Sequence, residues 1–61
     1  MKKLDIKSVE ILNDLKIVIG VRTNRELSVW LEVQPNTIST WRVNGIPPKV
    51  RKLIELVLYL Q

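Results

Sequence analysis

Residues 23–43 read TNRELSVWLEVQPNTISTWRV, and this stretch decides the fold of the chain. It opens with Thr23 and, three residues later, Glu26, a capping box in which hydroxyl and carboxylate bond each other's free backbone N–H groups. Pro35 fits the first position of a second helix, because its fixed φ and missing N–H suit that position. Only residues 32–34 separate the two helices, so the helices must turn sharply against each other. The spacing predicts a helix-turn-helix over about residues 23–43.

One further helix is predicted on each side of this stretch. We expect the first over about residues 9–19, with Ser8 as its N-cap and Gly20 as the left-handed residue that ends it. Pro48 begins the last helix, after the turn residues Asn44 and Gly45. Apolar residues recur at helical spacing and should face the core: Ile11, Leu12, Leu15, Val18, Ile19, Leu27, Leu31, Val33, Ile38, Trp41, Val50, Leu53, Ile54, Val57, Leu58 and Leu60, with Leu56 at the edge. The sequence therefore predicts one compact all-α domain over residues 1–61, with four helices or at most five.

The bulk composition excludes several classes of protein. The chain has 61 residues, of which 46% are hydrophobic and 26% charged, a globular balance in a single small domain. It has no Cys and no His, which excludes disulfides, the usual zinc sites and His-based catalytic triads. We therefore expect no catalysis, no metal, no cofactor and no small-molecule substrate. Neither a bilayer-spanning apolar run nor a signal peptide is recognisable, so a cytoplasmic location and no membrane partner are predicted.

The second helix of the central stretch has an outward face of short, uncharged side chains. Asn36, Thr37, Ser39 and Thr40 are poorer helix formers than the Glu and Lys of an ordinary solvated face, and groove contacts would explain that cost. An asparagine amide can pair with adenine, whereas serine and threonine can bond base edges or touch the thymine methyl group. The net charge of +4 also favours a polyanionic partner. The alternative interpretation is an ordinary polar helix face.

The segment from about Leu12 to Leu56 resembles the N-terminal DNA-binding domain of bacteriophage CI-type repressors, in the lambda-repressor-like helix-turn-helix class. The matching stretches are TNRELSVWLEV (23–33), QPNTISTWR (34–42) and the Ile-Pro pair at 46–47, and TISTW (37–41) is the most specific. The resemblance implies a sequence-specific transcriptional repressor that occupies operator DNA in a bacterial or phage-infected cell.

The resemblance also implies roles for particular residues. Family positions that approach bases correspond here to Pro35, Asn36, Thr37 and Thr40, and those that touch phosphate to Asn24 and Arg25. With the charge pattern added, we expect base contacts from Pro35, Asn36, Thr37, Ser39 and Thr40, and phosphate contacts from Asn24, Arg25, Gln34, Arg42 and Lys49. Two residues depart from the family pattern. Glu32 replaces a left-handed Gly, at a backbone cost of ~1–2 kcal/mol, and Ser28 replaces a small Ala.

Three features leave more than one interpretation open. The apolar surface of the last helix is too wide for one neighbour, so a homodimer is predicted, with Leu56, Leu60 and Trp30 at its interface. Trp30 could instead pack under the N-terminus or lie exposed. Residues 1–7 are expected to form a flexible basic arm, either phosphate-binding or an ordinary basic terminus. The rival function is a small protein-interaction or oligomerisation module, antitoxin-like or a phage regulatory protein, on the same scaffold.

Overall fold

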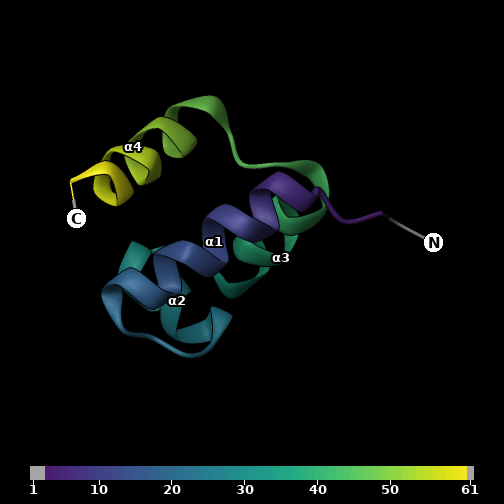
Figure 1. Ribbon diagram of the computed structural model, residues 1–61. Coiled ribbons are helices and arrows are strands. Elements are labelled where there is room, and N and C mark those ends of the chain that lie inside the picture. The colour runs from purple at the N-terminus through teal and green to yellow at the C-terminus, as the bar shows by residue number, and fades with distance from the viewer. Residues whose placement is uncertain (1–2, 61) are drawn as a thin grey trace.

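The structure, a computed structural model, describes residues 3–60 and is entirely helical. Its helices are α1 (Ile6–Ile19), α2 (Asn24–Leu31), α3 (Pro35–Asn44) and α4 (Pro48–Tyr59) (Figure 1). Residues 3–60 contain no strand and no fifth helix, so the predicted all-α class is confirmed. None of these helices is long and apolar enough to cross a membrane.

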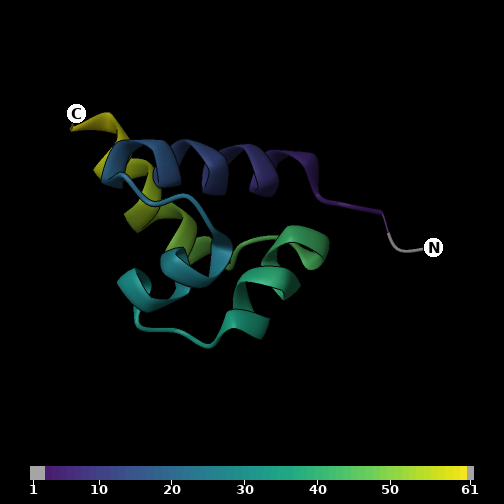
Figure 2. The same cartoon turned by 90° about the horizontal axis from the view of Figure 1, so that it is seen from below.

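The core is formed by one apolar cluster to which every helix contributes. Helix α1 packs against both α3 and α4, and α2 packs against α3 (Figure 2). The buried side chains are Leu12, Leu15, Leu27, Ile38, Trp41, Ile46 and Ile54. All of these except Ile46 were predicted from helical spacing. The prediction was wrong for Leu53 and Leu60, which are 65% and 71% exposed, because α4 is apolar over a wider arc than its neighbours cover.

Helix α1 begins at Ile6, about one turn earlier than the sequence predicts, and its N-cap is Asp5. The prediction of Ser8 as N-cap was wrong, since Ser8 lies inside the helix and is buried. Its hydroxyl donates to Asp5 Oδ2 and accepts the backbone N–H of Ile46 at 3.1 Å. The Asp5 N–H in turn donates to the Arg42 carbonyl at 2.7 Å. Ser8 therefore joins the start of α1 to the α3–α4 connection, a tertiary role that took the place of local capping.

Helix α2 has the predicted cap at Thr23, in a variant form. The Thr23 hydroxyl accepts the Glu26 N–H at 3.1 Å and donates to Glu26 Oε1 at 3.2 Å. The carboxylate thus bonds the capping hydroxyl instead of the Thr23 backbone N–H of a reciprocal capping box. One free N–H group of the first turn is satisfied by this cap.

The turn between α2 and α3 is left-handed, as predicted. Glu32 has φ 59° and ψ 41°, and within residues 3–60 no other residue except glycine has positive φ. The Val33 N–H donates to the Ser28 carbonyl at 2.9 Å and the Glu32 N–H to the Val29 carbonyl at 3.1 Å, the bonds of a Schellman motif. Ser28 is buried, and its hydroxyl is satisfied by the Arg25 carbonyl at 2.6 Å. The two departures from the family pattern are therefore accommodated within α2.

Replacing Glu32 with glycine is expected to stabilise the domain by roughly 0.5–1 kcal/mol. Glycine removes the cost of a side chain in the left-handed region, although it adds entropy to the unfolded chain. Urea denaturation followed by circular dichroism measures the change. Glu32→Ala is the matched control, because alanine keeps the left-handed strain and should leave the free energy of unfolding nearly unchanged. Equal stability of the glycine and alanine variants would contradict the prediction.

Candidate nucleic-acid interface

One side of α3 is anchored in the core and the other is uncovered. Ile38 is 0% exposed and Trp41 7% exposed, and together they hold the inner side of the helix. We call the outer side the α3 polar face, formed by Asn36, Thr37, Ser39 and Thr40. All of its residues are exposed except Thr37, which is half-buried. Pro35 and Gln34, directly before this face, are also exposed.

The polar groups of this face differ in what they can offer a ligand. The Thr40 hydroxyl donates to the Asn36 carbonyl at 2.9 Å, so its proton is used within the helix while its lone pairs and methyl group remain free. The Asn36 amide has no partner among residues 3–60, which leaves donor and acceptor available together. The Gln34 side chain makes no cap bond at the N-terminus of α3 and is likewise free.

The residues predicted to contact phosphate come from three helices and the turn before α3. Arg25 lies in the first turn of α2 and Lys49 in the first turn of α4, and both are exposed. Asn24 and Arg42 are half-buried. The single ion pair within residues 3–60 joins Arg51 Nε to Glu55 Oε2 at 3.4 Å. The charges of Arg25, Arg42 and Lys49 are therefore not neutralised by an acidic partner in the described part of the chain.

The predicted basic arm is shorter than expected. Lys7 is exposed but belongs to the first turn of α1, and Lys3 is exposed just before that helix. Lys2 lies outside the described residues. The helix extends into this segment because Asp5, not Ser8, caps it. The expected arm of residues 1–7 was therefore wrong over Ile6 and Lys7.

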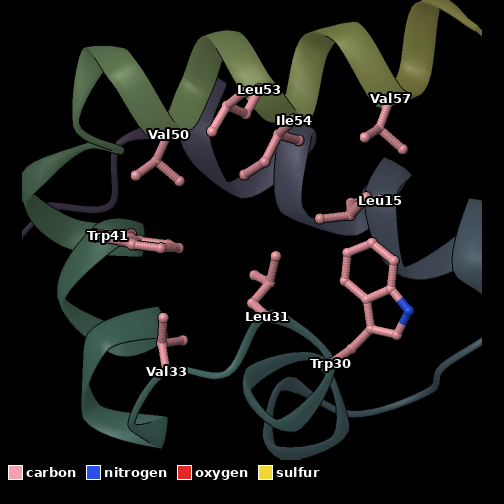
Figure 3. Close-up of a pocket in the computed structure, with 9 residues that line it drawn as sticks. All are labelled: Leu15, Trp30, Leu31, Val33, Trp41, Val50, Leu53, Ile54 and Val57. Atoms are coloured by element: carbon pink, nitrogen blue, oxygen red, sulfur yellow. The ribbon is translucent and has the colours of Figure 1, made fainter.

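An apolar groove of about 320 Å³ lies between α4 and the α2–α3 corner. Figure 3 shows the side chains of α4 along one wall and those of α2, the turn and α3 along the other. We call it the α4 groove, and its lining residues are Leu15, Trp30, Leu31, Val33, Trp41, Val50, Leu53, Ile54 and Val57. None of them carries an acid, a base or a nucleophile. Sequence reasoning missed the groove, and its one signal was the excess width of the apolar surface on α4.

The residues predicted for a dimer interface are all at the surface. Trp30 is 49% exposed, Leu56 53% and Leu60 71%. Trp30 lines the α4 groove, so its ring borders an apolar space instead of packing under the N-terminus. Elsewhere, residues 3–60 contain no cluster of acidic, His or Cys side chains that could hold a metal ion.

Comparison with known proteins leaves the family of the chain open. No protein-family model, curated protein or solved structure matches it. The function is therefore inferred from the residues and their arrangement alone.

Proposed function

We propose that this protein is a sequence-specific regulator of transcription, of the phage-repressor type, that binds double-stranded DNA and acts by occupying its operator. Helices α2 and α3 would form the helix-turn-helix. In this motif the second helix lies in the major groove with its N-terminal residues at the base edges, while the first crosses the backbone. The single observation that carries the proposal is the uncovered α3 polar face on a helix anchored by Ile38 and Trp41.

The proposal divides the contacts into two kinds. Phosphate contacts dock the domain and set its register, whereas contacts to base edges discriminate between sequences. The base-reading residues are Pro35, Asn36, Thr37, Ser39 and Thr40, and the phosphate-binding residues are Asn24, Arg25, Gln34, Arg42 and Lys49. A bound domain at a promoter would exclude the polymerase, so no catalytic step is needed.

The chemistry of the α3 polar face favours operators rich in A·T pairs. The face carries no Arg or Lys, so it lacks the bidentate contact to guanine that is the commonest specific contact in the major groove. Asn36 can make the bidentate contact to adenine. Thr40 has its proton engaged, so it can only accept a hydrogen bond from a base and can place its methyl group against that of thymine. Adenine and thymine are the bases that these groups recognise best.

Asn36→Ala is expected to relax sequence preference, whereas Arg25→Ala weakens binding to all duplexes about equally. Loss of a bidentate base contact costs ~1–3 kcal/mol of discrimination, while a phosphate contact carries no sequence information. Fluorescence anisotropy with the preferred duplex and with single-base variants measures both effects. Identical base preferences in the wild-type protein and Asn36→Ala would rule out the role assigned to Asn36.

Selection of bound duplexes from a random DNA pool tests the function as a whole. We expect an enriched motif with A·T pairs at the positions nearest α3, and an affinity that falls steeply as salt rises. A G·C-rich motif would contradict the base preference alone. No enrichment and no binding at low ionic strength would overturn the DNA-binding function.

A second function is favoured by one observation, the α4 groove. A small protein-interaction or oligomerisation module would use this apolar surface to hold another protein, and its complexes would tolerate salt. Salt-insensitive binding of an apolar helical peptide, together with indifference to DNA, would support this function over the first.

A further inference from the structure

Helix α4 has a second apolar side that no other helix covers. Leu53, Leu56 and Leu60 are 65%, 53% and 71% exposed, and their spacing of three and four residues places them along one side of the helix. We call this row the α4 stripe. Ile54, on the core side of the same helix, is only 3% exposed. The stripe is therefore distinct from the surface by which α4 packs on α1.

The α4 stripe and the α4 groove adjoin on the same molecule. Leu53 belongs to both, since it lines the groove and begins the stripe. Protein interiors are close-packed, so a groove of about 320 Å³ with an almost wholly apolar lining favours an apolar occupant over water. The stripe is an exposed apolar row of this kind, but within one chain it cannot reach the groove, because both are formed by the same rigid helix.

We propose that a second copy of this chain fills the groove, and that the α4 stripe of each protomer lies in the α4 groove of its partner. A two-fold axis beside Leu53 would exchange stripe and groove between the protomers. Such an interface is self-complementary and closes after two copies, so it would not propagate into fibres. The proposal goes beyond DNA binding, since it concerns association in the absence of DNA.

The exposed area agrees with this occupant. A compact monomer of 7.1 kDa exposes about 4,100 Å², whereas this chain exposes 4820 Å². The excess, about 700 Å², is close to the ~800 Å² that each partner buries in a standard interface. An apolar small molecule in the groove would leave Leu56 and Leu60 exposed, whereas a second copy would cover them.

Charges beside the two surfaces are complementary. Glu32 stands between the groove-lining residues Leu31 and Val33, and Lys52 precedes Leu53 of the stripe. Both charged side chains are exposed. With a stripe seated in the partner's groove, Lys52 of one protomer would face Glu32 of the other. If α4 packed only against α4, Glu32 would lie outside the interface.

The proposed interface leaves the α3 polar face free. In both ribbon views the C-terminal end of α4 lies on the side of the molecule away from α3 (Figures 1 and 2). Two protomers joined through α4 could therefore each present an α3 helix. Dimer formation and DNA binding can be measured separately on the same protein.

Analytical ultracentrifugation of the full chain without DNA tests the dimer. We expect a monomer–dimer equilibrium for the wild type, and a dimer at least roughly tenfold weaker for Leu56→Glu, because a Leu side chain then no longer becomes buried. Ile17→Glu is the control: Ile17 is 78% exposed on α1, away from stripe and groove, so this variant should dimerise like the wild type. Circular dichroism checks that both variants remain folded. A wild-type chain that stays monomeric at millimolar concentration, or equal dimerisation of both variants, would overturn the proposal.

A charge exchange tests the seating of the stripe in the groove. Glu32→Lys and Lys52→Glu should each weaken the dimer, and the double variant should recover most of the loss. Glu32→Lys retains a non-glycine residue in the left-handed turn, so its backbone strain is unchanged. A dimer unaffected by Glu32→Lys, or not recovered in the double variant, would overturn the groove arrangement. A chain that dimerises in this way yet ignores DNA would refute the proposed function and leave this inference intact.

Discussion

Ile38→Ala is expected to unfold most of the domain, with a loss of about 2–5 kcal/mol in the free energy of unfolding. Ile38 is fully buried, and within α3 only Trp41 shares this position in the core. The helix has little stability of its own, because Asn, Thr and Ser are poor helix formers and Gln34 provides no side-chain cap. Domains of this size rarely have more than about 3–5 kcal/mol in total, so the loss approaches the whole stability.

The matched control for this variant is its neighbour in sequence. Ser39 lies on the exposed side of the same helix, and Ser39→Ala should stabilise the domain slightly, because alanine is the better helix former. Urea denaturation of both variants, followed by circular dichroism, measures the difference. If Ile38→Ala were as stable as Ser39→Ala, α3 could not be anchored as described, and the exposure of its polar face would lose its basis.

Gly45→Ala is expected to destabilise the domain by about 3 kcal/mol. Gly45 has φ 98° and ψ 152°, a region in which other residues are strained by ~1–3 kcal/mol. A Cβ atom there would also lie 3.3 Å from Asp5 Oδ2, the oxygen that accepts the Ser8 hydroxyl. The substitution therefore strains the backbone and crowds the contact between the start of α1 and the α3–α4 connection.

Gly20→Ala separates these two effects. Gly20 also has positive φ, at 80°, but no heavy atom lies within 4 Å of the position that its Cβ would take. We expect this variant to lose only the left-handed backbone cost, ~1 kcal/mol. Thermal unfolding measures both variants, and each kcal/mol should lower Tm by roughly 4–8 °C in a domain of this size. Equal losses for the two glycines would show that Asp5 does not restrict position 45.

The sequence by itself determined where the helices of the central stretch begin and end. Thr23 caps α2, Pro35 starts α3, Pro48 starts α4, and the short connection requires a left-handed residue, which is Glu32. These signals are local, because a cap or a proline acts on the backbone within one turn of itself. Helical spacing likewise placed Asn36 and its neighbours on the side of α3 opposite Ile38.

Only the tertiary structure decided which partners the remaining groups have. Ser8 was expected to cap α1, but its bond to the Ile46 N–H spans 38 residues and has no local signal. The spacing of α4 predicts an apolar surface wider than one neighbour needs, yet it does not say which part is covered. The packing of α4 on α1 left Leu53 and Leu60 exposed and opened the groove beside Trp30. Periodicity determines the faces of a helix, whereas the choice of a partner for each face depends on contacts between residues far apart in the chain.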